Sequence, residues 1–182
     1  MAAEERDAAG VGPLELTEPE LVAWGERIGA TVAVPVVFAL RGELGAGKSV
    51  LARAIARGAG VAGPMPSPTF NLVHRYAAAR GVDIVHLDLY RLDDPDEVWE
   101  LGWRELGSDA EIVLVEWPER AESLLPEDRW DIYLERPGQG DAEVGGVREV
   151  RVVRGVRRGD APAVPDVPRG AGDAGGFGGV DA

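Results

Sequence analysis

The stretch Val34-Pro35-Val36-Val37-Phe38-Ala39-Leu40, followed by Gly42-Glu43-Leu44-Gly45-Ala46-Gly47-Lys48-Ser49, decides the fold. Its first part is a nearly continuous apolar run, which is typical of a strand buried on both faces of a parallel sheet. Its second part fits the pattern G-x-x-x-x-G-K-S without a gap. Residues 50–55 continue at helical spacing, and the helix is predicted to end near Gly58 or Gly60. The order of strand, loop and helix predicts an α/β fold, a three-layer P-loop NTPase with a small, mostly parallel central sheet.

The glycine-rich loop has the residue types that phosphate binding requires. Its glycines let the backbone wrap closely and point several N–H groups inward, and the following helix adds its positive N-terminal end. Lys48 is expected to reach the outer phosphates, and the Ser49 hydroxyl is expected to coordinate Mg²⁺. The sequence therefore predicts that the whole loop binds ATP or GTP with Mg²⁺, whereas the plainer interpretation is an ordinary glycine-rich turn. The predicted nucleotide contacts are Gly42, Glu43, Leu44, Gly45, Ala46, Gly47, Lys48 and Ser49.

Lys48 is also the only lysine of the chain. Of the 19 basic residues, the other 18 are arginines. Lysine is a compact ammonium on a flexible stem, whereas arginine is a planar fork, so a site that needs an ammonium between phosphate oxygens would resist the exchange. This composition favours a phosphate-binding role for Lys48 over a chance survivor of an arginine-biased composition.

Composition narrows the class of protein. The chain has 182 residues and an apolar fraction of 45%, which is enough for one domain with a core, and its net charge is −13. So acidic a chain is not expected to grip a nucleic-acid backbone unaided, because such binding depends on Lys and Arg. No apolar run reaches the roughly 18 residues of a membrane span, and residues 1–7 lack the features of a signal peptide. Without cysteine there is no disulfide framework, and we expect a soluble, cytoplasmic protein.

The rest of the chain predicts further helices and strands around this loop. A capping box at Thr17 and Glu20 begins a helix over 18–29, and Asp94-Pro95 begins a second helix that ends before Gly107. Further strands are predicted at 70–76, 82–90, 112–115, 130–134 and 147–153. We expect a disordered N-terminus over 1–13, an ATPase domain over 14–155 and a disordered Gly/Pro-rich tail over 156–182.

Two acidic residues end predicted strands beside the loop. Asp88 follows the run 84–87, and Glu116 follows the run 112–115. Ligands of open α/β sheets bind at the carboxyl ends of the strands, and a P-loop site needs a carboxylate there for Mg²⁺. One acid would hold the metal and the other would orient or deprotonate the attacking water, but the residues leave this division open. The plainer interpretation of either acid is a solvated strand end.

Three other residues have a functional and an ordinary interpretation. Thr69, in the motif Ser67-Pro68-Thr69-Phe70, could sense a γ-phosphate, although a plain turn is favoured by its composition. Trp117 could pack near the nucleotide or fill the core. His86 lies among apolar neighbours on a strand, where a lone histidine is more often a core residue than a catalyst.

Four motifs in this order resemble the TsaE (YjeE) family of bacterial ATPases that take part in tRNA threonylcarbamoyladenosine formation. They are the loop 42–49, the motif 67–70, His86-Leu87-Asp88-Leu89-Tyr90-Arg91 and Glu116-Trp117-Pro118-Glu119, and the resemblance runs from about residue 16 to 135. It implies slow ATP hydrolysis in the service of a TsaB–TsaD pair, which attaches threonylcarbamoyl to the adenosine beside the anticodon. The tRNA would be reached only through these partners.

The resemblance also implies roles for single residues. Lys48 and the loop glycines would bind phosphate, Ser49 and Glu116 would hold Mg²⁺, and Asp88 would be needed for hydrolysis. Thr69 would belong to a switch-like segment near the phosphates, so the implied catalytic set is Asp88, Lys48 and Thr69, and Trp117 joins the nucleotide contacts. The start of the first helix, near residues 18–21, would approach the adenine. The chain departs from the family by Ser49 and Leu21, where threonines are usual, and by the stretches 138–146 and beyond 155.

Two alternatives remain at this point. A small-molecule kinase of the P-loop class would need an acceptor pocket and usually an arginine-rich lid. Arg75, Arg80 and Arg91 are candidates for it, but no insertion of lid length is visible. A nucleotide-dependent interaction module with negligible turnover would keep the loop and would not need Asp88. Apart from the family, no base-reading motif decides between ATP and GTP.

Overall fold

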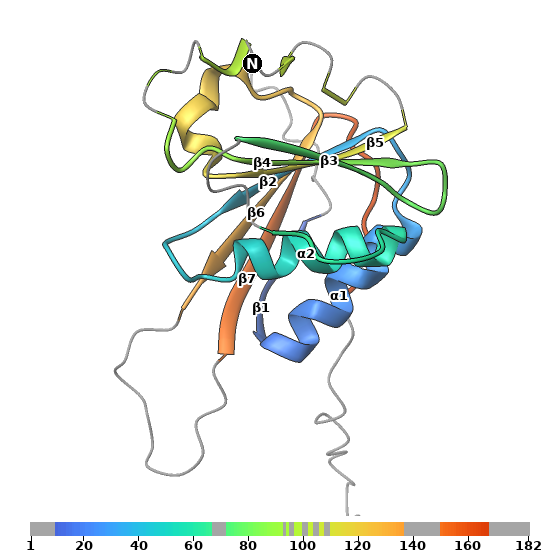
Figure 1. Cartoon of the computed structure of the whole chain (residues 1–182). Coiled ribbons are helices and arrows are strands. Elements are labelled where there is room, and N and C mark those ends of the chain that lie inside the picture. Colours follow the sequence, from blue (N-terminus) through green and yellow to red (C-terminus); the bar gives the residue numbers. More distant parts are fainter. Residues whose placement is uncertain are drawn as a thin grey trace, which may run out of the picture.

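The computed structural model describes residues 10–66, 72–92, 94, 97–99, 102–103, 106–107, 110–136 and 150–167 (Figure 1). The strands are β1 (Val11–Thr17), β2 (Val36–Arg41), β3 (Val73–Ala77), β4 (Asp83–Asp88), β5 (Glu111–Glu116), β6 (Arg129–Glu135) and β7 (Val150–Arg158). The helices are α1 (Glu18–Thr31), α2 (Lys48–Ala59) and the 3₁₀ helix η3 (Pro118–Leu124). No helix within these ranges is long and apolar enough to cross a membrane.

The seven strands of the described residues form one sheet in the order β1-β7-β6-β2-β5-β4-β3. The four central strands β6, β2, β5 and β4 are parallel. The outer strands are antiparallel to their neighbours, β3 on β4 at one edge and β7 on β6, then β1 on β7, at the other. The predicted α/β fold is therefore confirmed, with the parallel part confined to the centre of the sheet, where β2 leads into the glycine-rich loop.

Two layers cover the sheet (Figure 1). α1 and α2 lie on one face, where Phe38 and Leu40 of β2 join a core cluster with Leu51 and Ile55 of α2. η3 and the turns around residues 97–107 lie on the other face, which receives Val37. The alternation along β2 shows why its sequence is apolar throughout: each face of a central strand packs against a different layer.

The two helices of the first layer approach each other closely through glycines. A Cβ at Gly29 would lie 1.8 Å from the Ile55 carbonyl oxygen, and one at Gly58 would lie 2.0 Å from that of Glu26. The predicted capping box is present at the start of α1, where the Thr17 backbone N–H donates to Glu20 Oε2 at 2.8 Å. The glycine contacts join the C-terminal halves of α1 and α2, so the two helices lie side by side in this layer.

The predicted domain boundaries differ from the structure at both ends. Residues 11–13, expected to be disordered, open the edge strand β1, which pairs with β7. β7 itself runs past 155 to Arg158, and the carbonyl oxygens of Pro162 and Pro165 accept hydrogen bonds from the indoles of Trp130 and Trp24 at 2.7 and 3.0 Å. Buried indole N–H groups need acceptors, and this segment provides them. Residues 1–9 and 168–182 lie outside the described ranges.

The predicted helix over 94–106 is wrong in the residues that can be compared. The described parts form turns of the 3₁₀ type, with i to i+3 hydrogen bonds from Glu97 N–H to Asp94, from Gly102 to Trp99 and from Leu106 to Trp103. Gly102 itself has a φ of +74°, which an α-helix cannot contain. The other predicted strands are present, with ends shifted by a few residues.

Candidate functional site

The glycine-rich loop between β2 and α2 encloses the Lys48 side chain. Its Nζ donates to the carbonyl oxygens of Gly42 and Glu43 at 2.6 and 2.8 Å, and the residue is only 4% exposed. Gly42 and Gly47 have φ values of +140° and +110°, which side chains rarely adopt. A Cβ at Gly42 would also lie 2.2 Å from the Leu134 carbonyl oxygen. The glycines are thus required for the loop to turn from β2, past Leu134 of β6, into α2.

The two predicted acids come together beside this loop. β4 and β5 are parallel neighbours, and their register pairs Asp88 with Glu116, so both acids end at the same edge of the sheet. Glu116 is buried, and its Oε2 accepts a hydrogen bond of 2.8 Å from Ser49 Oγ on α2. Asp88 lines the same cavity as Lys48 and Ser49. Both strand-end acids therefore lie beside the glycine-rich loop.

His86 also belongs to this site, although the sequence favoured a core residue. Its Nε2 lies 2.8 Å from Glu116 Oε1, and the side chain is 1% exposed. The two-residue period of a strand places His86 on the same face as Asp88, and this is the signal that the sequence contains. The sequence does not show that β4 pairs with β5. This pairing places His86 diagonally across from Glu116.

Trp117 adopts a left-handed backbone conformation, with φ +58° and ψ +47°, directly after β5. This turn brings the indole over the loop, where Lys48 Nζ lies 3.8 Å from the ring centroid. The Tyr90 ring packs on the indole with a centroid distance of 4.9 Å. A non-glycine residue in this conformation is strained, and such strain often marks a functional site. Trp117 is thus a wall of the cavity, and its ring stabilises the ammonium by a cation–π contact.

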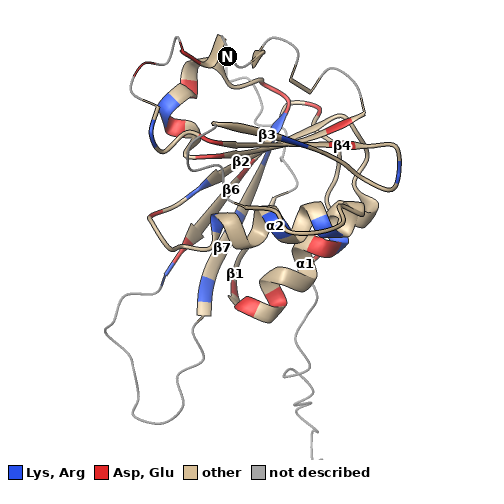
Figure 2. Ribbon diagram, viewed as in Figure 1, with Lys and Arg blue, Asp and Glu red and all other residues tan. Residues whose placement is uncertain are grey.

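These residues surround a cavity of about 530 Å³. Its lining includes the predicted residues Leu44, Gly45, Gly47, Lys48, Ser49, Asp88, Glu116 and Trp117. Gly42, Glu43 and Ala46 shape the loop from behind, and Thr69 lies outside the described residues. Sequence reasoning missed three arginines that also line the cavity, namely Arg53, Arg136 and Arg151, and it offered the fourth, Arg91, only for the lid of a kinase. They come from separate elements, with Arg53 on α2 and Arg151 on β7, so no local motif could reveal them. Figure 2 shows basic residues on both of these elements.

Charge inside the cavity differs from that of the whole chain. The lining carries one lysine and four arginines against two carboxylates, while the chain has a net charge of −13. Burial lowers the pKa of Lys48, and the carboxylates of Glu116, Glu119 and Asp88 oppose this effect. Arg151 also fixes the loop, because its Nε donates to the Ala46 carbonyl oxygen at 3.1 Å and its Nη2 to Glu18 Oε2 at 3.0 Å. The cavity is suited to a polyanion that brings its own negative charge.

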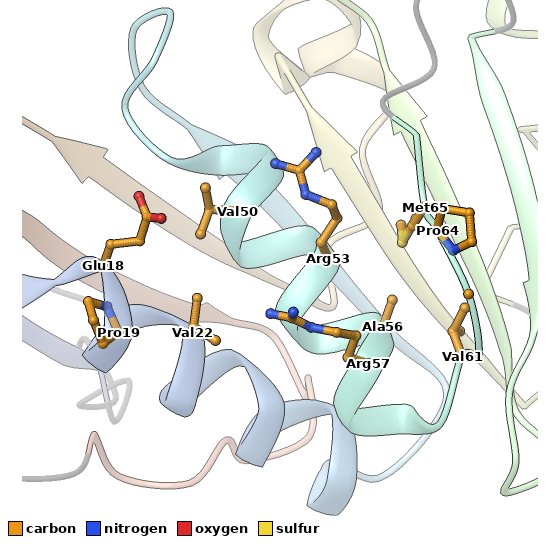
Figure 3. Close-up of a pocket in the computed structure, with 11 residues that line it drawn as sticks. Glu18, Pro19, Val22, Val50, Arg53, Ala56, Arg57, Val61, Pro64 and Met65 are labelled. Carbon is orange, nitrogen blue, oxygen red and sulfur yellow. The ribbon is translucent and has the colours of Figure 1, made fainter.

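A second cavity of about 540 Å³ continues from the first between α1 and α2 (Figure 3). Both cavities are lined by Val50 and Arg53. The remaining lining is mostly apolar, with Glu18 and Arg57 at its sides: Glu18, Pro19, Val22, Ala56, Arg57, Val61, Gly63, Pro64 and Met65. The loop thus has a cationic cavity on one side and a mainly apolar groove joined to it.

The family of the chain follows from comparison with known proteins. A sequence model described as "Threonylcarbamoyl adenosine biosynthesis protein TsaE" matches residues 16–144. This chain belongs to the TsaE family. The resemblance read from the four motifs is thereby confirmed, and the matched span includes the loop, both acids and His86.

Individual TsaE proteins support the same assignment. The "tRNA threonylcarbamoyladenosine biosynthesis protein TsaE" of Haemophilus influenzae is 44% identical over 92 residues, which is 50% of this chain and 58% of that protein. The protein of the same name from Mycobacterium tuberculosis is 39% identical over 127 residues, 66% of this chain and 76% of that protein. The crystal structure of Bacillus subtilis YdiB superimposes with a TM-score of 0.62 at 25% identity, over 80% of this chain and 86% of that chain.

Proposed function

We propose that this protein is a Mg²⁺-dependent ATPase of the tRNA threonylcarbamoyladenosine modification system and that it acts with a TsaB–TsaD pair. The single observation that carries the ATPase part is that the glycine-rich loop and the two strand-end acids line the same cavity. Lys48 and Ser49 at the start of α2, Glu116 in contact with Ser49, and Asp88 beside it line one cationic cavity. The tRNA part rests on the family and on the names of its members.

Each group in the cavity has a task in phosphoryl transfer to water. The loop N–H groups, the N-terminus of α2 and the Lys48 ammonium bind the phosphate oxygens and stabilise the charge that spreads over them. Asp88 accepts a hydrogen bond from the attacking water, orients it and takes up its proton. Trp117 shields the ammonium from solvent, which strengthens its interaction with the outer phosphates.

The residues beside Lys48 suit a magnesium ion. Mg²⁺ prefers hard oxygen ligands, and it is commonly held by one or two protein groups together with substrate phosphates. Ser49 Oγ and Glu116 Oε2 are such oxygens, and they lie 2.8 Å apart at the phosphate end of the cavity. These two residues would hold the ion, which would neutralise negative charge on the nucleotide phosphates.

The groove between α1 and α2 suits the base and ribose of the nucleotide. It adjoins the phosphate cavity at Val50 and Arg53, and its apolar lining offers a surface for a flat base. Pro19 and Val22 of α1 line it, whereas Leu21 points into the core and is fully buried. We therefore assign the approach to the base at this end of α1 to Pro19 and Val22, and not to Leu21.

The test is steady-state ATP hydrolysis by the purified full chain, alone and with a TsaB–TsaD pair from the same source. We expect slow turnover alone, faster turnover with the pair, and loss of both in the Lys48→Ala variant. A pair that neither binds nor changes turnover would remove the tRNA-modification part of the proposal. Transfer of the γ-phosphate to a small acceptor instead of water would favour a kinase.

Asp88→Asn separates an ATPase from a nucleotide-dependent interaction module. We expect the variant to keep ATP binding and to lose about 100-fold or more in turnover, the range typical of a lost general base. Fluorescent-nucleotide titration measures the binding, and phosphate release measures the turnover. Turnover equal to wild type would remove Asp88 from the mechanism and leave the module as the better interpretation.

A further inference from the structure

Glu116 has a separate hydrogen-bond donor for each of its carboxylate oxygens. Oε2 accepts from Ser49 Oγ at 2.8 Å, and Oε1 lies 2.8 Å from His86 Nε2. The donors come from two elements, α2 and β4, and both His86 and Glu116 are almost fully buried. A buried carboxylate is costly unless hydrogen bonds compensate the loss of water. The pair of donors therefore fixes the plane of this carboxylate as well as stabilising its charge.

The chemistry of the contact identifies the proton that His86 uses. An ionised carboxylate only accepts hydrogen bonds, so Nε2 must carry hydrogen. Within the described residues, Nδ1 of His86 is buried and has no hydrogen-bond partner. The only polar contact that the described structure gives this ring is thus the one with Glu116.

Without the hydrogen bond from His86, the Glu116 carboxylate has a second charged group toward which it can rotate. The Lys48 ammonium is close enough for the Glu116 carboxylate to influence its pKa. A carboxylate free to rotate would be drawn toward that ammonium, away from Ser49. Such a rotation would move Oε2 from the place where the metal is held.

We propose that His86 is a positioning residue for the divalent metal. It holds Glu116 so that Oε2 stays at Ser49 and the remaining lone pairs of the carboxylate stay available to the ion. The inference rests on the proposed function, because the metal belongs to it. Residues that hydrogen-bond a metal ligand orient it, and their loss typically costs 10- to 100-fold in metal affinity. The role of His86 is to bind neither nucleotide nor ion but to set the geometry of the group that does.

The experiment compares two substitutions of His86 with one of the other histidine. His86→Gln keeps an N–H donor near the place of Nε2, and His86→Leu fills the space without a donor. His74→Leu is the matched control. His74 lies opposite His86 in the register of β3 and β4, but its Nδ1 lies 3.0 Å from Tyr76 Oη. The full chain is titrated with a fluorescent ATP analogue, first in EDTA and then with increasing Mg²⁺.

We expect His86→Leu to need about 10- to 100-fold more Mg²⁺ to reach half of the Mg²⁺-dependent change in fluorescence. Its affinity for the nucleotide analogue in EDTA should stay within about twofold of wild type. His86→Gln and His74→Leu should stay within about threefold of wild type. Circular dichroism establishes that each variant is folded. A folded His86→Leu protein with wild-type Mg²⁺ dependence would overturn the inference. If that variant does not fold, His86→Gln decides: tenfold weaker Mg²⁺ dependence in the folded protein would overturn it as well.

The two proposals fail in different ways. Wild-type protein that binds the nucleotide analogue no better with Mg²⁺ than in EDTA would overturn the metal site, and the role of His86 with it. Wild-type protein with normal Mg²⁺ dependence, together with an indifferent His86→Leu variant, would overturn only the positioning role. The Ser49→Ala variant serves as the reference, because it lacks a candidate metal ligand. It should raise the Mg²⁺ concentration needed for half of the effect at least as much as His86→Leu does.

Discussion

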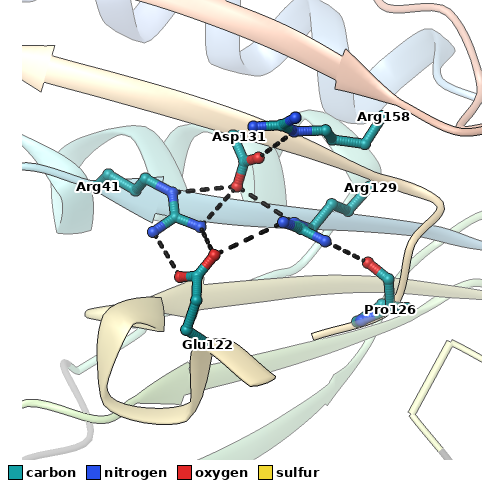
Figure 4. A network of polar contacts seen from close by, with 6 residues as sticks. All are labelled: Arg41, Glu122, Pro126, Arg129, Asp131 and Arg158. Atoms are coloured by element: carbon teal, nitrogen blue, oxygen red, sulfur yellow. Dashed lines mark hydrogen bonds and ion pairs between the residues drawn. The ribbon is translucent and has the colours of Figure 1, made fainter. Parts of the chain in front are cut away.

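Asp131→Asn should destabilise the protein by about 3 kcal/mol, because Asp131 is a fully buried carboxylate surrounded by three guanidinium groups (Figure 4). Oδ1 accepts from Arg41 Nε and Nη2 at 3.0 and 2.8 Å and from Arg129 Nε at 3.2 Å. Oδ2 accepts from Arg158 Nε at 2.8 Å. Asparagine keeps the shape, removes the charge and turns one acceptor into an NH₂ group that faces guanidinium donors.

The magnitude follows from how much of this network stays satisfied. Removing one partner of a buried ion pair typically costs about 3–5 kcal/mol. Arg158 is 49% exposed, and Arg41 keeps two hydrogen bonds to Glu122 at 2.8 and 2.9 Å, so these groups lose less than fully buried ones would. The low end of the range, about 3 kcal/mol, is therefore expected. For a chain of this size, that lowers Tm by about 6–12 °C.

Urea unfolding followed by circular dichroism measures the effect. The midpoint should fall while the m-value stays the same, because the surface exposed on unfolding hardly changes. Glu122→Gln is the control. The Glu122 side chain is 50% exposed and contacts two of the same arginines, Arg41 and Arg129, so loss of its charge should cost less than about 1 kcal/mol. An Asp131→Asn variant within 1 kcal/mol of wild type would refute the reasoning, since the network would then contribute no more than surface charges do.

The pH dependence of this difference has a definite sign. Burial acts to raise the pKa of Asp131, but the hydrogen bonds from Arg158 and Arg41 outweigh it and hold the pKa below its usual value. A carboxylate with a lowered folded-state pKa stabilises the protein fully above its unfolded pKa of about 3.9 and loses this contribution as pH falls through the folded value. The gap between wild type and Asp131→Asn should be constant near neutral pH and shrink below about pH 4.

Two further substitutions test the helix contact and the loop. Gly29→Ala should lower the free energy of unfolding in urea by about 2 kcal/mol or more, since its Cβ would lie 1.8 Å from the Ile55 carbonyl oxygen. Ala30→Ser, on the exposed side of α1, is the control and should change this free energy by less than about 0.5 kcal/mol. Gly47→Ala should weaken ATP binding about tenfold or more, because left-handed backbone costs a side chain about 1–2 kcal/mol and the Cβ would lie 2.8 Å from Arg151 Nε. Gly81→Ala, also at positive φ but with open space around it, should keep wild-type affinity in the same fluorescence titration.

The sequence was sufficient wherever a residue's neighbours along the chain determine its structure. The loop 42–49 and the apolar run before it predict β2, the turn and α2, and the capping box predicts the start of α1. The edge strand β1 could not be predicted in this way. Its apolar alternation is interrupted by Gly12-Pro13, and it is stabilised by pairing with β7, which lies more than a hundred residues further along the chain. Contacts at such separation leave no local pattern to read.

The 3₁₀ turns around residues 97–107 show the opposite failure. The segment begins with strong helix-start residues, which predicts an α-helix from local preference alone. Its apolar side chains instead pack across the sheet, with Val98 and Trp103 in the core cluster of that face and the Trp103 indole donating to the Leu124 carbonyl oxygen at 2.8 Å. Packing outweighs local helix preference here, because each helical residue gains only a fraction of a kcal/mol from its propensity.

The candidate site shows how much depends on a single register. His86 and Asp88 share a face of β4 because they are two residues apart, and this the sequence could supply. The register that pairs Asp88 with Glu116 brings His86 and Asp88 next to Glu116 on the neighbouring strand β5. Because α2 lies over the same face, Ser49 also reaches Glu116. A shift of one residue in β4 would turn His86 and Asp88 to the opposite face, under η3 and away from the loop. The hydrophobic alternation that buries Val85 and Leu87 in the opposite cluster is therefore what keeps the polar residues at the phosphate cavity, so core packing and site geometry are specified by the same residues of β4.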